Sequence, residues 1–255
     1  MARPKIKADI TLEVRLNQVE TDEASRQAYD HIYDGDGLTQ LESFYLWLLE
    51  IMRLQPSTRY LDISCGRGEL ISYAKNKHIQ NVHGLDLSES ALAFCRRKTT
   101  HNNLTTGNSQ QLPYRDNAFD VISNIGSLEH YVDMPMAVRE TARVLTHDGR
   151  AYILVPNTFS LLNNIWIAFR HGYTSYDPYQ PIQRYAARIE WQELLEENGL
   201  IVEKTLGYDR PRPRTWNDLT TRYLANPREL VRWLASPFIP LNLAFCFVFI
   251  CRKGS

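Results

Sequence analysis

The chain has 255 residues, and its 29 basic and 29 acidic side chains leave it with no formal net charge. This length is enough for one large α/β domain, so we predict a single domain over residues 1–255. Because the chain lacks the basic field that non-specific nucleic-acid binding requires, we expect no nucleic-acid partner. The four cysteines form neither a CxxC pair nor a zinc-type cluster, so we predict reduced thiols and no metal site.

Two features precede the first predicted strand. Residues 1–9 lack the apolar core of a signal peptide, so we expect a cytoplasmic protein. Apolar residues recur at helical spacing from Leu41 to Met52, and this pattern predicts an amphipathic helix that ends before Pro56.

The strongest motif runs from Tyr60 to Glu69. A short apolar run closes on Asp62 and is followed by a tight turn with Gly66 and Gly68, after which helical spacing resumes. The two glycines let the backbone turn sharply and approach a nucleotide-like ligand. The pattern therefore predicts the strand, loop and helix of a nucleotide-binding βαβ unit.

Charge distinguishes between the nucleotides that such a loop binds. A dinucleotide site has a third glycine, where this chain has Ile71, and it places a pyrophosphate at the helix N-terminus, where acids would repel it. Asp62 and Glu69 instead favour a ligand that carries an ammonium and a sulfonium, and S-adenosylmethionine (SAM) is that ligand. Residues 61–68 resemble the first motif of the class I SAM-dependent methyltransferases, Leu-Asp-x-Gly-Cys-Gly-x-Gly. Ser64 stands where the family usually has glycine, and serine tolerates left-handed dihedral angles less well.

This resemblance implies an α/β fold: a seven-stranded, mostly parallel, doubly wound sheet with a C-terminal antiparallel strand, the Rossmann-like methyltransferase fold. It also implies SAM as the cofactor and an N-terminal lid, residues 1–40, that folds over it. For the aromatic and acidic stretch 29–37 within this segment, the alternative is a surface loop that its tyrosines anchor to the core.

A second predicted strand, residues 81–86, also closes on an acid. Asp86 lies near the spacing at which a carboxylate binds the ribose hydroxyls in such folds, and the alternative is a solvated turn residue. Ser88 is the expected N-cap of the next helix. Residues 107–122 resemble the family's third-strand and fourth-strand region, where an aspartate commonly accepts a hydrogen bond from the adenine amino group. Here Asn108 occupies that place, and it either accepts through its carbonyl oxygen or is only a turn residue.

The loop after the fourth strand, residues 125–131, is expected to face both cofactor and substrate, because ligands of open α/β sheets lie at the carboxyl ends of the strands. His130 is the candidate general base, since histidine titrates near neutral pH and can take a proton from a hydroxyl or an amine as the methyl moves. The alternative is that His130 only shapes the pocket or hydrogen-bonds the backbone. Glu129 is the weaker candidate for the general base.

The remaining elements are predicted as a helix at 134–145 capped by Asp133, a turn at 147–149, a strand at 151–156, a helix at 189–198 and a strand at 201–207. Two inserts, about 157–184 and 209–240, are expected to cover the substrate. Aromatic side chains of the first insert line a substrate pocket or attach the insert to the core, and its front, 161–169, is expected to be helical. The second has six arginines between Asp209 and Pro237 against three acids. That excess suits an anionic substrate, an acidic membrane surface or plain solvated charge.

The segment 233–251 is mostly apolar and nearly long enough to span a bilayer, but Pro237 and Pro240 interrupt it as a helix. Its last part, 243–251, is rich in aromatic and β-branched residues, which is typical of a buried strand. We therefore predict no transmembrane segment and expect an antiparallel strand inserted at the sheet edge.

The predicted function is transfer of a methyl group from SAM to an oxygen or nitrogen of a small molecule, such as a sugar, a lipid or a secondary metabolite. The alternatives are methylation of RNA or protein, and a SAM-binding partner subunit without catalysis; the sequence does not indicate the oligomeric state. The predicted cofactor-binding residues are Asp62, Ser64, Gly66, Gly68, Asp86, Leu87, Asn108, Ser109, Asn124 and Ile125. The predicted substrate-binding residues are Tyr33, His130, Tyr131, Trp166 and Arg184.

Overall fold

The computed structural model describes residues 12–15, 19–35, 38, 40–99, 103–177 and 180–254. Its main sheet consists of β2 (Arg59–Ile63), β3 (Asn81–Asp86), β4 (Leu104–Thr106), β5 (Phe119–Ile125), β6 (Leu145–Pro156), β8 (Leu200–Tyr208) and β9 (Cys246–Lys253). The strand order is β4-β3-β2-β5-β6-β9-β8; the first five are parallel, and β9 runs antiparallel to both of its neighbours. The predicted seven-stranded α/β fold is confirmed.

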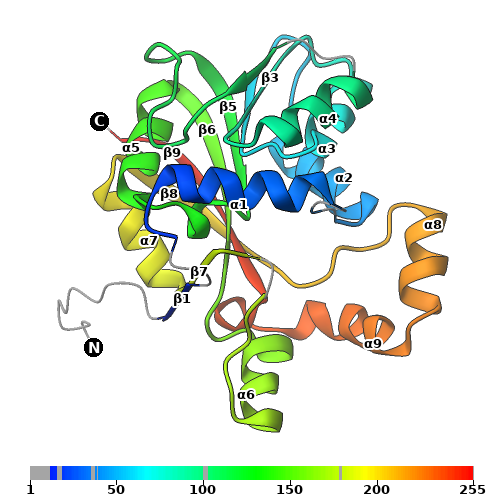
Figure 1. Cartoon of the computed structure of the whole chain (residues 1–255). Coiled ribbons are helices and arrows are strands. Elements are labelled where there is room, and N and C mark those ends of the chain that lie inside the picture. The colour runs from blue at the N-terminus through cyan, green and yellow to red at the C-terminus, as the bar shows by residue number, and fades with distance from the viewer. Residues whose placement is uncertain are drawn as a thin grey trace.

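Helices cover both faces of this sheet (Figure 1). They are α2 (Glu42–Met52), α3 (Glu69–Asn76) and α4 (Glu89–Thr99), and then α5 (Met134–Val144) and α7 (Arg188–Glu197). The first three share one buried cluster with the sheet, in which Ile71 and Leu92 are fully buried. The last two share the other cluster, which includes Val138 and Trp191. The strands β2, β3, β5 and β6 contribute side chains to both clusters, so they are covered on both sides.

Side-chain caps explain where two of these helices, α4 and α5, begin. The Ser88 hydroxyl accepts a 3.1 Å hydrogen bond from the amide of Ala91 at the start of α4. The Asp133 carboxylate does the same at 2.8 Å for Met136 in α5. Both residues were predicted as N-caps, and such side chains satisfy amides that have no partner within the helix.

The last strand differs from its expected place at the sheet edge. β9 lies between β6 and β8, so β8 forms the edge. Phe247, Val248 and Phe249 are fully buried, which accounts for the apolar sequence of this strand. In the described residues, no helix is both long enough and apolar enough to cross a membrane.

The predicted turn at 147–149 lies within β6, where the pairing is irregular. Phe119 of β5 faces Leu145, but Val121, two residues later, faces Arg150. The residues between Leu145 and Arg150 therefore have too few partners on β5. The turn pattern marks this irregularity in the ladder and not the start of the strand.

Two N-terminal elements were not predicted. Helix α1 (Asp22–Asp34) begins at Thr21, whose hydroxyl accepts a hydrogen bond from the amide of Ala24. It crosses the carboxyl ends of the parallel strands (Figure 1) and meets α4, where the Ser88 hydroxyl donates a 2.6 Å hydrogen bond to Asp30. Strand β1 (Leu12–Arg15) pairs antiparallel with β7 (Ile182–Tyr185). Of the expected lid, residues 1–11, 16–18, 36, 37 and 39 lie outside the described residues.

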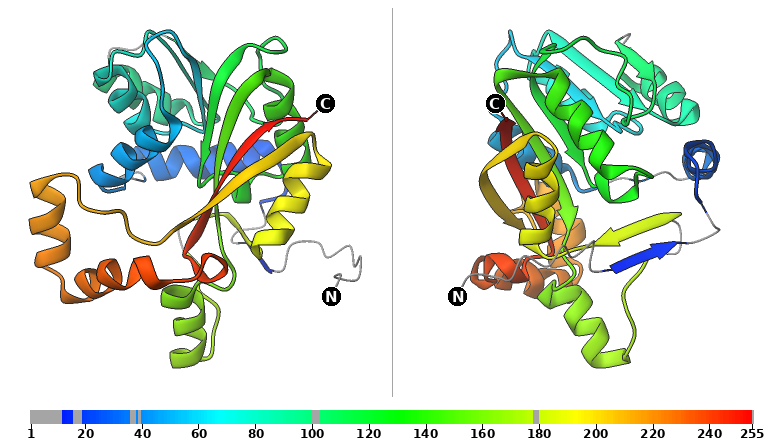
Figure 2. Two further views of the ribbon diagram at one scale, coloured as in Figure 1. Left: turned by 180° about the vertical axis from the view of Figure 1, so that it is seen from behind. Right: turned by 90° about the vertical axis from the view of Figure 1, so that its left-hand side faces the viewer.

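The two inserts form short helices. The first contains a turn of π-helix, η2 (Leu161–Ile165), and α6 (Trp166–His171), so the predicted helical front is confirmed. The second contains α8 (Trp216–Asp218), η3 (Leu219–Leu224), α9 (Pro227–Ala235) and η4 (Ser236–Phe238), and η5 (Leu241–Leu243) follows it. In both views of Figure 2 these segments extend beyond the end of the sheet at which the parallel strands finish.

Candidate functional site

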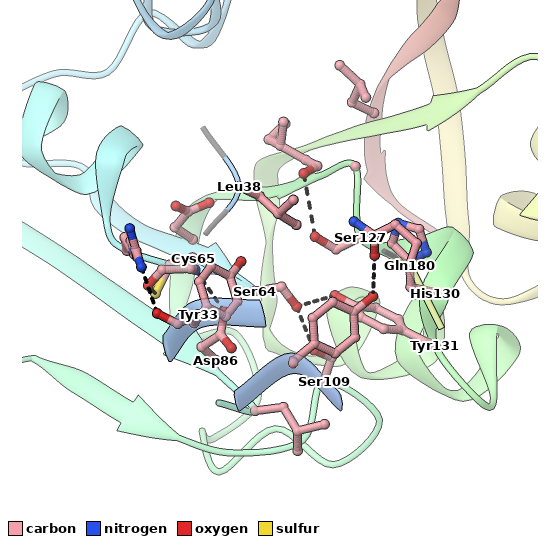
Figure 3. A pocket seen from close by; sticks show the side chains of 18 of the residues that line it. Tyr33, Leu38, Ser64, Cys65, Asp86, Ser109, Ser127, His130, Tyr131 and Gln180 are labelled. Atoms are coloured by element: carbon pink, nitrogen blue, oxygen red, sulfur yellow. Dashed lines mark hydrogen bonds between the residues drawn. The ribbon is translucent and has the colours of Figure 1, made fainter. Parts of the chain in front are cut away.

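A cavity of about 310 Å³ lies at the carboxyl ends of β2, β3 and β5 (Figure 3). Its floor comes from the loop after β2 and from Asp86 at the end of β3. One wall comes from the 3-10 turn η1 (Leu128–His130) and Tyr131, and α1 covers it with Tyr29 and Tyr33. This is the position at which open α/β sheets bind ligands.

The loop after β2 has the backbone geometry that its glycines predict. Gly66 and Gly68 have φ angles of 54° and 77°, in the left-handed region that favours glycine. A Cβ atom at Gly66 would lie 2.8 Å from the Tyr33 hydroxyl, and one at Gly68 would lie 2.1 Å from the Cys95 sulfur. Neither position therefore accepts a side chain without a rearrangement of its surroundings.

Ser64 adopts the conformation for which the family uses glycine. Its φ angle is 56°, so the serine is in the left-handed region. Its hydroxyl shares a 2.8 Å hydrogen bond with the hydroxyl of Tyr131 and lies 3.5 Å from that of Ser109. The side-chain amide of Asn124 also donates to Tyr131, at 3.0 Å. The serine thus links loops at the ends of three strands.

Asp62 and Asp86 form a buried acidic pair beside the cavity. Asp62 is 4% exposed and accepts a 2.5 Å hydrogen bond from the Ser123 hydroxyl, and burial raises its pKa to about 7. Asp86 is 5% exposed and accepts from the amides of Gly66 and Ser88 at 2.8 and 2.9 Å, and burial raises its pKa to about 6. Both carboxylates would ionise more readily beside a cation, because an opposite charge favours the charged form.

Asn108 has a charged partner on α1. Its side-chain amide donates a 2.7 Å hydrogen bond to Asp22, and the Gln110 amide donates to the other oxygen of Asp22 at 2.5 Å. The carbonyl oxygen of Asn108 accepts from the backbone and the side chain of Gln110. The structure therefore places a carboxylate next to the position at which the family commonly has one.

His130 and Glu129 lie in η1, and burial shifts the pKa of each away from its ordinary value. Burial lowers the pKa of His130 to about 4, so its imidazole is neutral near pH 7. Its Nδ1 atom is hydrogen-bonded to the carbonyl oxygen of Ile182, which fixes the proton on Nδ1 and leaves Nε2 unprotonated. Glu129 is 6% exposed, its Oε1 lies 3.7 Å from Nε2 of His130, and burial raises its pKa to about 8. Its Oε2 has no hydrogen-bond partner among the described residues.

Most predicted site residues gather at the cavity. The predicted cofactor residues that line it are Asp62, Ser64, Gly66, Asp86, Leu87, Asn108, Ser109 and Ile125, and the predicted substrate residues that line it are Tyr33, His130 and Tyr131. Four others lie elsewhere. Gly68 packs against Cys95, Asn124 supports Tyr131, Trp166 is 57% exposed on α6, and the buried Arg184 binds Glu13 and the carbonyl of Tyr131.

The prediction did not include several residues that α1 and the segment before β7 bring to the cavity, among them Asp22, Tyr29 and Gln180. The Tyr29 hydroxyl donates a 2.9 Å hydrogen bond to the side chain of Gln180, 151 residues away. The signal for α1 was present in the sequence, because Thr21 followed by Asp22 and Glu23 is a helix start. Nothing local indicates where that helix docks.

Comparison with known proteins agrees with this site. A family model described as a methyltransferase domain matches residues 61–153, which run from β2 to β6. A probable S-adenosylmethionine-dependent methyltransferase of Mycolicibacterium smegmatis is 33% identical over 151 residues, which are 58% of this chain and 53% of that protein. Over this region the chain is similar to SAM-dependent methyltransferases. SAM is therefore the cofactor that its site is expected to hold.

Other similar proteins have names that refer to different reactions. A demethylmenaquinone methyltransferase of Bacillus mycoides is 29% identical over 51% of this chain and 56% of its own length. The chain thus matches little more than half the length of these curated methyltransferases. The crystal structure of the [4+2]-cyclase SpnF has a TM-score of 0.65 at 16% identity and covers 92% of this chain and 97% of its own. That likeness shows the fold alone.

The residues of this methyltransferase site fit SAM. Gly66 presents its backbone to the cavity without a side chain, and the Tyr33 hydroxyl of α1 lies close to where a Cβ atom would be. Asp62 and Asp86 are two buried acids that form no ion pair with a basic side chain in the described part of the chain, and SAM carries an ammonium and a sulfonium. Asp62 suits the cationic end and Asp86 the ribose hydroxyls, while Asn108 lies where the adenine is expected.

Proposed function

We propose that this chain transfers a methyl group from SAM to an oxygen or nitrogen of a small-molecule acceptor. The observation that carries the proposal is one cavity that two buried acids and a neutral histidine line together. The acids serve the cationic cofactor, and the histidine serves the acceptor. Both kinds of group come from loops on one edge of a rigid sheet, where small-molecule sites are common.

When bound, SAM supplies a methyl group that its sulfonium already activates. The residues of the chain then need to hold the acceptor in line, exclude water and accept the acceptor's proton. His130 suits the last task because Nε2 is unprotonated and Nδ1 is held by the Ile182 carbonyl. With its pKa near 4, this imidazole is a weak base, so an acceptor with an already acidic proton, such as an aromatic or enolic hydroxyl, suits it best.

The cover over the cavity supports a small acceptor over RNA or protein. Tyr29 reaches from α1 to Gln180, and the Arg67 guanidinium donates a 2.6 Å hydrogen bond to the carbonyl of Tyr33 at the end of the same helix. A macromolecular acceptor would have to displace α1, whereas a small molecule needs only a transient opening. We therefore include α1 in the proposal as the lid over the site.

The two departures from the family motif have local partners, which favours an active enzyme over a silent SAM-binding subunit. Ser64 occupies a glycine conformation and is tied to Tyr131 by a hydrogen bond. Asn108 is paired with the carboxylate of Asp22. A site that has lost its role has no need of such compensation.

Two measurements test the proposal. Calorimetric titration with SAM and with NAD should show binding of SAM alone, and binding of NAD with no response to SAM would overturn the cofactor assignment. Incubation with SAM labelled in its methyl group and with fractionated extract should then label a small-molecule fraction. Label in RNA or protein instead would favour the macromolecular alternative, and SAM binding without label in any fraction would favour the silent subunit.

A further inference from the structure

Exposed apolar side chains gather on the helices of the two inserts. Trp166 and Phe169 of α6 are 57% and 80% exposed, Val231 and Leu234 of α9 are 64% and 56% exposed, and Phe238 of η4 is 86% exposed. We call these five residues the apolar face. Isolated exposed apolar residues are normal, but this set comes from α6 and from the consecutive helices α9 and η4, which lie at one end of the molecule (Figure 1).

Hydrogen bonds at their bases hold the two inserts together. Asn157, which follows β6 and leads into the first insert, donates its side-chain amide to the carbonyls of Asn242 and Ala244 at 3.0 and 2.8 Å. These two residues lie between the second insert and β9. Figures 1 and 2 show α6 and α9 on the same side, beyond the carboxyl ends of the parallel strands, which is also the end that carries the cavity.

Residues 157–176 and 210–245, which carry the apolar face, contain exposed arginines and no exposed acid, and the adjoining Asp177 and Asp209 are half-buried. Residues 157–176 contain no aspartate or glutamate at all. Residues 210–245 contain two acids, and both are buried: Asp218 accepts a hydrogen bond from the Ser43 amide, and Glu229 contacts three arginines. Arg170 and Arg228 are exposed and form no ion pair with any residue that the structure describes.

We propose that the apolar face is a docking surface for a membrane of anionic lipid. Aromatic and aliphatic side chains enter the boundary between headgroups and acyl chains, while Arg170 and Arg228 meet lipid phosphates. The side chains stand out from separate short helices, so they fit a phase that deforms around them better than they fit a preformed protein groove. A second copy is a poor partner, because a twofold contact would bring arginines against arginines with no exposed acid between them.

This interaction goes beyond methyl transfer and does not depend on it. Its consequence is that the edge carrying the cavity would be held near the bilayer. An acceptor with an apolar tail would then have a short path into the site. Binding to the membrane is measured without SAM or acceptor, so failure of either proposal leaves the other intact.

The test is sedimentation of the protein with vesicles at low and high salt. Vesicles of phosphatidylcholine are compared with vesicles of equal parts phosphatidylcholine and phosphatidylglycerol. We expect binding to the anionic vesicles that weakens at high salt, because surface charge is screened. Replacement of both arginines, Arg170→Gln with Arg228→Gln, should weaken binding by more than about tenfold, since each basic residue near an anionic surface gives about a fivefold gain. The variant Phe169→Ser with Phe238→Ser should abolish binding, although both side chains are exposed and the fold does not need them.

Matched controls lie elsewhere on the surface. Met136→Ser removes an exposed apolar side chain from α5, and Arg115→Gln removes an exposed arginine before β5; both should bind as the unmodified protein does. An unchanged circular dichroism spectrum and an unchanged thermal midpoint show that each variant is folded. The proposal is overturned if the unmodified protein ignores anionic vesicles, or if the two-phenylalanine variant still binds them. It is also overturned if the protein is a dimer that this variant converts to monomer, since a second copy would then be the occupant.

Discussion

Asp22 of α1 accepts a 2.7 Å hydrogen bond from the side-chain amide of Asn108, 86 residues further along the chain. The carboxylate commonly found at the end of the third strand in this family is therefore present, but another part of the chain supplies it. This exchange couples the lid helix to the place where we expect the adenine.

Exchange of these two side chains tests the coupling. We expect Asp22→Asn and Asn108→Asp each to weaken SAM binding by about tenfold, the first because it removes the carboxylate and the second because it opposes two carboxylates. The double variant restores one acid and one amide and should bind within about twofold of the unmodified protein. Calorimetry measures all three, with Glu23→Gln on the exposed side of α1 as the control. Additive losses in the double variant would remove Asp22 from this role.

SAM binding should depend on pH through Asp62. Burial holds the pKa of this carboxyl at about 7 in the free protein, and a bound ammonium or sulfonium would lower it. Affinity should therefore be highest above about pH 7 and fall as the pH decreases through that value, because binding then requires release of a proton. Asp62→Asn should bind more weakly and lose most of this dependence. Titrations in buffers of different ionisation enthalpy count the released protons, and an identical pH profile for Asp62→Asn would exclude Asp62 as the group responsible.

His130→Asn separates catalysis from binding. Asparagine retains a donor for the Ile182 carbonyl but removes Nε2, so we expect turnover to fall by at least about a hundredfold while SAM affinity stays the same. Because the pKa of His130 is about 4, the activity of the unmodified enzyme should show no loss from this group between about pH 8 and pH 5. The control is His147→Asn, which changes an exposed histidine near the N-terminal end of β6. Unchanged turnover in His130→Asn would leave the histidine only a positioning role.

Glu129 should destabilise the protein as the pH rises. Its pKa is about 8 in the folded chain and near the ordinary value of 4.5 in the unfolded chain, so the unfolded state releases its proton first. The stability of the folded state is then lost progressively between about pH 4.5 and pH 8 and changes no further above that range. Glu129→Gln keeps a neutral side chain of the same shape, so it should be more stable than the unmodified protein by on the order of a few kcal/mol at pH 8.

Urea denaturation across this pH range measures that difference, with the exposed Glu197→Gln as the control. A constant difference between Glu129→Gln and the unmodified protein at every pH would show that Glu129 does not titrate as described.

The elements predicted correctly are those whose signals are local. The strand that ends on Asp62, the glycine turn and the N-caps Ser88 and Asp133 each depend on a few consecutive residues, and the structure has them as expected. Most of the predicted cofactor residues line one cavity for a related reason, since parallel strands bring their carboxyl ends to one edge of the sheet.

The remainder depends on contacts between distant parts of the chain. The pairing of β1 with β7 joins residues about 170 positions apart, as between Leu12 and Tyr185, and no local pattern specifies it. Likewise, Tyr29 meets Gln180 only after α1 has docked. The place of β9 inside the sheet also depends on its pairing with both β6 and β8, which are distant in the sequence.

That inner position of β9 bears on synthesis of the protein on the ribosome. β9 pairs with β6 on one side and with β8 on the other, and the two neighbours have no ladder with each other. Until residues 246–253 have emerged, a nascent chain therefore presents the open, apolar edge of β6 and leaves β8 unpaired. Such edges recruit other strands, so the interval before the last strand is made is when this chain most needs a chaperone.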